Sequence, residues 1–90
     1  MFKFHVIFIF EKDFQLNTYL EFDHPPTEAQ FLFEAMDFLT YEQLSRLRRI
    51  NAAQCDTEDD SRWLSWIKNS NGRYFFDIVR NPVYANLRTT

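Results

Sequence analysis

Histidine and cysteine, which serve as soft metal ligands and in nucleophilic catalysis, occur only three times in this 90-residue sequence. The soft metal ligands are His5, His24 and Cys55, and no two of them stand at a metal-binding spacing such as Cys-x-x-Cys or His-x-x-x-His. Cys55 is followed by Asp56, whose negative charge disfavours the reactive thiolate. We therefore expect no metal site, and a small hydrolase that uses Cys55 is only a third hypothesis about function.

The carboxylates and glycines give no catalytic pattern either. Glu58, Asp59 and Asp60 cluster where a helix is expected to begin, and the positive end of the helix dipole explains carboxylates there. The single glycine, Gly72, cannot make a glycine-rich phosphate-binding loop. The sequence therefore predicts no catalytic residue, no cofactor and no enzymatic activity.

The most concentrated positive charge is formed by Arg46, Arg48 and Arg49, which fall within one turn of an expected helix. Guanidinium groups spaced in this way can bind phosphates or the carboxylates of a partner protein. A solvated helix face, aided by Glu42, explains the same arginines without any binding role. Contact with nucleic acid through these arginines is the alternative function that we consider.

Composition favours one folded domain over residues 1–90. Hydrophobic residues make up 46% of the chain and aromatic residues 19%, which excludes a disordered tail or a linker. A single cysteine excludes an intrachain disulfide and favours a reducing, cytoplasmic compartment. No apolar stretch approaches the roughly 18 residues of a membrane span, so we expect no membrane association.

The charge of the chain is unevenly distributed. The net charge is −3, which does not favour general affinity for nucleic acid. Residues 1–45 carry two lysines against eight carboxylates, a charge of −6, whereas residues 46–90 carry +3. A polarised surface is therefore expected if the fold separates the two halves, and such polarity usually serves partner orientation or solubility.

Two strands are expected at the start of the chain. Residues 2–10 are β-branched or aromatic at almost every position, which indicates a strand covered on both faces rather than a secretory leader. Residues 14–22 alternate between apolar and polar side chains, as in a half-exposed strand. A three-residue loop over 11–13 keeps the apolar faces together, whereas a two-residue loop mixes them. The resulting pairs are Phe2 with Phe22, Lys3 with Glu21, Phe4 with Leu20, His5 with Tyr19, Phe8 with Leu16 and Phe10 with Phe14.

Two Thr-x-x-Gln sequences predict helix starts. Thr27 and Gln30 form a capping-box pattern directly after two prolines that end the sheet. Thr40 and Gln43 form a second such pattern, which marks either a new helix or a bend. The second helix is expected to fade near residues 52–55.

The remainder of the chain is predicted to add a third helix and a third strand. The helix should begin in the acidic run 56–60, bury Trp63 on its apolar stripe, and end at the single glycine. Residues 73–80 are predicted to form a strand. The predicted fold is a single α+β domain of order ββαααβ, with the helices on one face of an antiparallel sheet of order 2-1-3, in which residues 2–10 lie between 14–22 and 73–80.

Helices on one face would leave the other face of the sheet open. That face would carry Ile7, Ile9 and Tyr19 from the hairpin, together with one of the two faces of residues 73–80. Exposed aromatic patches mark protein interfaces. The alternatives are that the last residues of the chain cover this face, or that isolated exposed apolar residues have no role.

These observations favour a non-catalytic protein that binds another protein, with a second copy of the same chain (a homodimer) as one candidate partner. A small acidic domain without catalytic residues would suit a stoichiometric inhibitor. Examples are a phage anti-defence protein (anti-CRISPR-like) and a toxin-neutralising immunity protein. The candidate partner-binding residues are Ile7, Ile9, Tyr19 and Phe75 as apolar contacts, with Arg46, Arg48 and Arg49 as polar contacts.

Overall fold

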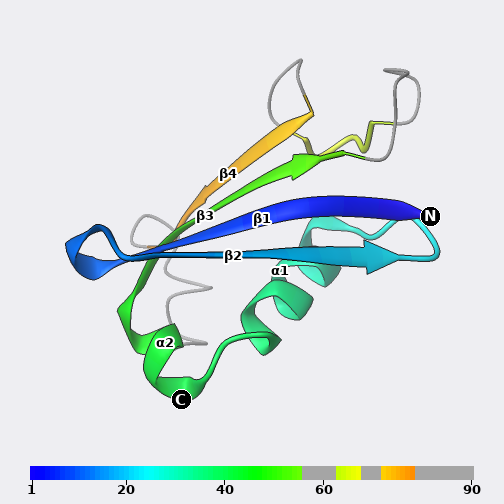
Figure 1. The fold of residues 1–90 in the computed structure, drawn as a ribbon. Coiled ribbons are helices and arrows are strands. Elements are labelled where there is room, and N and C mark those ends of the chain that lie inside the picture. The colour runs from blue at the N-terminus through cyan, green and yellow to red at the C-terminus, as the bar shows by residue number, and fades with distance from the viewer. Residues whose placement is uncertain (56–62, 68–71, 79–90) are drawn as a thin grey trace.

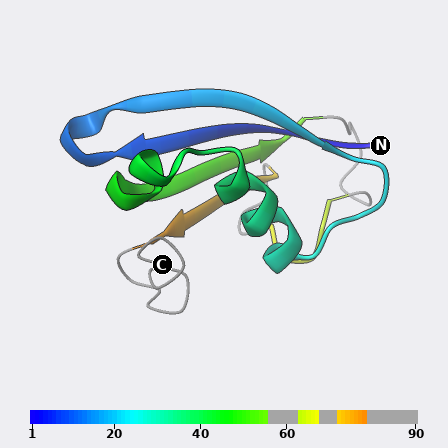
Figure 2. The same cartoon turned by 90° about the horizontal axis from the view of Figure 1, so that it is seen from below.

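The structure, a computed structural model, describes residues 1–55, 63–67 and 72–78. Within these ranges the class is α+β, as predicted, with a four-stranded antiparallel sheet of order β2-β1-β3-β4 (Figure 1). The two helices lie on one face of the sheet (Figure 2). In chain order the elements are β1 (Phe2–Phe10), β2 (Gln15–Phe22), α1 (Glu28–Asp37), α2 (Tyr41–Arg46), β3 (Leu47–Gln54) and β4 (Arg73–Asp77).

The β1–β2 hairpin has the predicted register. The loop is a 3-10 turn over Glu11–Asp13, and the amide of Phe10 donates to the carbonyl of Phe14 at 2.8 Å. Lys12 and Asp13 have φ angles of 63° and 61°, so two non-glycine residues occupy the left-handed region that a tight loop requires. The confirmed pairs include Phe2 with Phe22, Lys3 with Glu21, Phe4 with Leu20, His5 with Tyr19 and Phe8 with Leu16.

Both predicted capping boxes are present. The Thr27 hydroxyl accepts from the amide of Gln30 at 3.1 Å, and the Gln30 side chain accepts from the amide of Thr27 at 3.0 Å. Thr40 and Gln43 make the same reciprocal pair at the start of α2. The second box therefore begins a new helix and is not a bend within α1.

The prediction that the second helix continues to residues 52–55 was wrong. α2 ends at Arg46, and Leu47–Gln54 forms β3. This strand pairs with β1 on one side and with β4 on the other, so both of its edges make backbone hydrogen bonds. Such long-range pairing outweighs the helix preference of a segment rich in Leu, Arg, Ala and Gln. Residues 73–77 therefore pair with β3 and not with β1, and the predicted order 2-1-3 becomes 2-1-3-4.

A β-bulge lies at the start of β3. The register of β3 against β1 shifts between the pairs Phe10–Leu47 and Ile9–Arg49, which leaves Arg48 as an extra residue. Leu47 and Ile50 are buried on either side, whereas Arg48 and Arg49 are both exposed. The bulge therefore breaks the alternation that would identify this segment as a strand.

The third predicted helix is absent from the described part of its span, because residues 63–67 form a turn. The indole Nε1 of Trp66 donates to the carbonyl of Pro26 at 2.9 Å, which fastens this turn to the segment before α1. The expected start of the helix at 56–60 lies outside the described residues, as do residues 79–80 of the predicted third strand.

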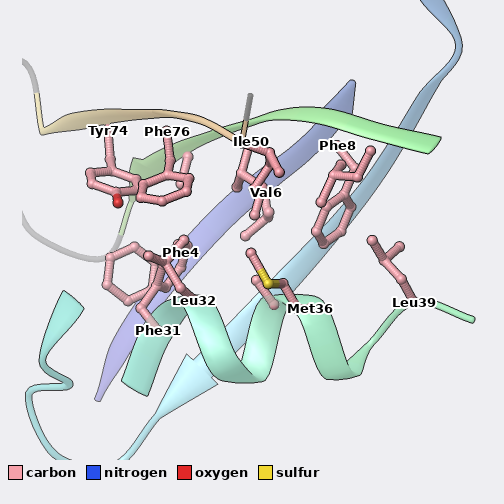
Figure 3. Packing of buried hydrophobic residues seen from close by; sticks show 14 of the residues in the cluster. Phe4, Val6, Phe8, Phe31, Leu32, Met36, Leu39, Ile50, Tyr74 and Phe76 are labelled. Atoms are coloured by element: carbon pink, nitrogen blue, oxygen red, sulfur yellow. The ribbon is translucent and has the colours of Figure 1, made fainter. Parts of the chain in front are cut away.

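The hydrophobic core lies between α1 and the helix-facing side of the sheet. Figure 3 shows side chains of α1 directed toward the sheet and side chains of β1, β3 and β4 directed back toward the helix. Phe31 is at the centre of the aromatic packing, with its ring centroid 4.9 Å from that of Phe4 and 5.2 Å from that of Trp66. The side chains that meet here include Phe4, Val6, Phe8, Phe31, Leu32, Met36, Ile50, Tyr74 and Phe76.

Candidate protein-binding surface

The sheet face opposite the helices, which we call the open face, carries every second residue of each strand. The pairing of β2, β1, β3 and β4 aligns these residues in rows across the sheet. The rows are Tyr19–His5–Ala53–Arg73, Asn17–Ile7–Asn51–Phe75 and Gln15–Ile9–Arg49–Asp77.

The four predicted apolar contacts share the open face. Of the two faces considered for the strand predicted at 73–80, the one that carries Phe75 is the open one, because Tyr74 is buried in the core. Tyr19 is 58% exposed and Phe75 is 48% exposed, whereas Ile7 and Ile9 are half-buried. Two aromatic side chains are thus accessible near opposite borders of this face.

These apolar residues do not form one continuous patch. Asn51 lies between Ile7 and Phe75 in the middle row. The Tyr19 ring stacks on His5 with centroids 5.0 Å apart, and the imidazole Nε2 of His5 is hydrogen-bonded to Asn17 Oδ1 at 3.1 Å. The open face therefore alternates apolar and hydrogen-bonding side chains.

Asn51 leaves a buried polar atom without a partner. Its side-chain Oδ1 is inaccessible to solvent and accepts no hydrogen bond, the only such side-chain atom in the part of the chain that the structure describes. An unsatisfied buried acceptor costs about 1–3 kcal/mol. Asn51 is therefore a costly residue at the centre of the open face.

The structure separates the three arginines that the sequence placed on one helical turn. Arg46 is the last residue of α2, where its guanidinium lies 3.3 Å from the Glu42 carboxylate. Arg48 lies in the bulge, and Arg49 lies on the open face, 4.0 Å from Asp77. The prediction that all three lie on one helical turn was wrong, because the helix ends at Arg46, and of the three only Arg49 lies on the open face with the apolar candidates.

The histidines and the cysteine have structural partners. The imidazole Nδ1 of His24 lies 2.8 Å from Asp23 Oδ1, and this hydrogen bond lowers the pKa of the Asp23 carboxyl. The amide of Cys55 donates to the carbonyl of Lys3 at 2.9 Å and extends the pairing of β1 with β3. Among the residues that the structure describes, no three His, Cys, Asp or Glu side chains gather where they could hold a metal ion.

The sequence reasoning missed a second surface, the groove between β2 and the helices. Phe14 was expected on the core side of the hairpin, but it is 74% exposed because it precedes β2 and lies outside the core cluster. Three hollows of about 410, 820 and 440 Å³ follow this border from Met1 to Arg46. Phe33, which is not among the buried residues of α1, is 66% exposed and lines one of these hollows. The apolar residues that line the hollows are Met1, Phe10, Phe14, Leu16, Leu20, Phe22, Ala29 and Phe33.

Within the described ranges, neither helix is long and apolar enough to cross a membrane. Comparison of the chain with models of protein families, with curated proteins and with solved structures finds no match.

Proposed function

We propose that the protein has no catalytic activity and acts by binding another protein through the open face. The observation that supports this proposal is the placement of Tyr19 and Phe75, both about half exposed, on a sheet face opposite the helices. Aromatic side chains among hydrogen-bonding neighbours are typical of interfaces, where rigid rings provide anchors within a polar rim. Asn17 and Arg49 are such neighbours.

Asn51 also places an amide side chain at the centre of this face, between Ile7 and Phe75. A protein that binds a partner without catalysing a reaction acts by occupying the partner's surface. This is how a stoichiometric inhibitor of the anti-defence or immunity type, which the sequence suggested, would act. The alternative of nucleic-acid contact gains no support, because Arg46, Arg48 and Arg49 do not share one helical turn.

The proposal can be tested with one substitution and a matched control. Phe75→Ser removes an exposed ring from the open face, whereas Tyr41→Ser removes one that is 63% exposed from the start of α2. The tagged proteins would be used to capture partners from cells of the source organism, with identification by mass spectrometry. We expect Phe75→Ser to lose a protein that the wild type and Tyr41→Ser both retain. Equal capture by all three proteins would refute a role for the open face.

A further inference from the structure

We propose that the outer edge of β2 binds an extended, basic segment of a partner protein, which adds to the sheet as a fifth strand. This inference rests on the proposed protein-binding function and specifies the chemistry of the partner. It combines three observations: outward-pointing backbone groups along β2, hollows on the inner side of β2 that are lined by both apolar and polar side chains, and an excess of carboxylates around them.

The first observation concerns the backbone of β2. This strand pairs with β1 on one side, and it is an outer strand of the sheet in the part of the chain that the structure describes (Figure 2). Inward and outward backbone groups alternate along an antiparallel strand. The bond from the Phe10 amide to the Phe14 carbonyl shows that the even-numbered residues beside and within β2 point their backbone groups toward β1. The bond from the Cys55 amide to the Lys3 carbonyl is consistent with this alternation, because it shows that the backbone groups of odd-numbered residues of β1 point toward β3. The residues whose amide and carbonyl point outward are therefore Gln15, Asn17, Tyr19 and Glu21.

Such an edge selects for an extended chain. Four residues at alternate positions, each with an outward N–H and C=O group, match the hydrogen-bonding groups of another strand, and an unprotected edge is a known template for strand addition. Natural edge strands are commonly blocked by proline, by a bulge or by lysines. β2 contains no proline and no lysine, and its register with β1 is regular from Gln15 to Phe22.

The second observation is that the added strand would find places for its side chains. Alternate side chains of a strand point to opposite faces of a sheet. One set would lie beside Tyr19 and Asn17 on the open face. The other set would enter the hollows on the helix side, where Leu16, Leu20 and Phe22 are only half-buried.

The third observation is the charge around these hollows. Their lining includes five carboxylates, and the cations among the lining residues are Lys12 and Arg46. Arg46 is paired with Glu42 and Glu21 with Lys3, and the carboxylates that remain still outnumber Lys12, so the lining keeps a net negative charge. A basic segment is therefore the complementary occupant. The lining carboxylates are Glu11, Glu21, Asp23, Glu34 and Glu42.

The same charges argue against a second copy of this chain at the β2 edge. Pairing β2 with β2 would bring two sets of carboxylates together, and like charges placed opposite each other across strands are destabilising. The chain also carries a net charge of −3. Self-pairing along β2 is accordingly an outcome that the experiment must be able to detect.

The experiment uses a capped peptide of alternating Lys and Val with the length of β2, 8 residues, and the full chain. Amide hydrogen exchange would be followed by NMR. Without peptide, the amides of Asn17 and Tyr19 should exchange faster than those of Thr18 and Leu20, because only the latter pair with β1. With peptide, exchange at Asn17 and Tyr19 should slow by about ten-fold. A peptide of alternating Glu and Val should have no effect.

A proline substitution isolates the backbone contribution. Asn17→Pro removes an outward amide without removing a bond to β1, and proline is tolerated on edge strands at such positions. The matched control, Asn17→Ala, keeps the amide. We expect Asn17→Pro to weaken peptide binding by about ten-fold or more relative to Asn17→Ala, because it removes a hydrogen bond and places a ring on the edge.

Three outcomes would overturn the proposal. The first is equal affinity of Asn17→Pro and Asn17→Ala for the basic peptide, and the second is tight binding of the acidic peptide. The third is amide exchange along β2 that slows with rising protein concentration in the absence of peptide, which would identify a second copy as the occupant. If Asn17→Pro fails to fold, the exchange data on the wild type still decide. Loss of a captured protein in Phe75→Ser without any peptide effect would leave the open-face function standing and remove only the strand-addition proposal.

Discussion

The hydrogen bond between Tyr74 and Glu28 offers a sensitive test of how β4 packs against α1. The hydroxyl of Tyr74 lies 2.5 Å from Glu28 Oε2, and the Tyr74 side chain is fully buried while Glu28 is half-buried. Hydrogen bonds to charged groups contribute about 1.5–3 kcal/mol. Because the half-buried carboxylate keeps some contact with water, we expect a coupling energy of about 1–2 kcal/mol.

A double-mutant cycle measures this coupling. Tyr74→Phe removes the hydroxyl but keeps the ring, which packs edge-on against Trp66 and Phe31. Glu28→Ala removes the acceptor. Urea unfolding of the wild type, both single variants and the double variant gives the free energy of unfolding of each, and the non-additive part is the coupling.

The result also has a thermal signature. A loss of 1 kcal/mol lowers Tm by roughly 4–8 °C in a domain of this size. Additive single changes, with a coupling below about 0.3 kcal/mol, would mean that the two side chains do not interact. The placement of β4 over the start of α1 would then be refuted.

Three further changes test other parts of the structure. Asn51→Val should raise the free energy of unfolding, measured by urea unfolding, by about 1–2 kcal/mol, because it removes an unsatisfied acceptor. A destabilised variant would show that the side-chain carbonyl of Asn51 has a hydrogen-bond partner. Gly72→Ala should lower the free energy of unfolding by about 1–2 kcal/mol and lower Tm, because φ at this residue is +68° and a Cβ would lie 3.2 Å from the Trp63 ring. An unchanged Tm would contradict this backbone geometry. His24→Ala should raise the pKa of Asp23 in an NMR titration. Because the pKa is lowered in the folded protein, the pair stabilises the fold at neutral pH, and this contribution is lost as pH falls through the pKa of Asp23 in the folded protein. An unchanged pKa in the variant would exclude His24 as the cause of the shift.

The hairpin and the helix starts could be predicted because their signals are local. A shift of one residue would move every apolar side chain of the strand at 14–22 to the wrong face, so only one register was acceptable. The capping boxes at Thr27 and Thr40 each depend on residues three positions apart. Such features do not require knowledge of the rest of the fold.

β3 could not be predicted in the same way because its conformation depends on distant partners. The spacing of Leu47 and Ile50 fits a helix, and the bulge at Arg48 hides the alternation of a strand. What selects the extended form is pairing with β1 and β4. One signal was available: β1 is apolar on both faces, which indicates a central strand that needs two neighbours.

The candidate surface was predicted in part. Alternation alone assigned Ile7 and Tyr19 to the same face, and the structure places them there. The choice between the faces of the strand at 73–77 needed the register with β3, which puts Phe75 opposite Asn51. The groove beside β2 was missed because Phe14 was assigned to the core, and burial depends on how far the helices extend over the sheet.

The position of β1 in the centre of the sheet affects how the protein folds during synthesis. Its partner β2 follows after a short loop and can pair as soon as both segments leave the ribosome. Its second partner, β3, is translated only after both helices, so one edge of an apolar strand stays without its native neighbour for that interval. Unpaired strand edges in nascent chains are sites of aggregation and of chaperone binding. The emergence of residues 47–54 from the ribosome is therefore the step that allows this edge of β1 to pair.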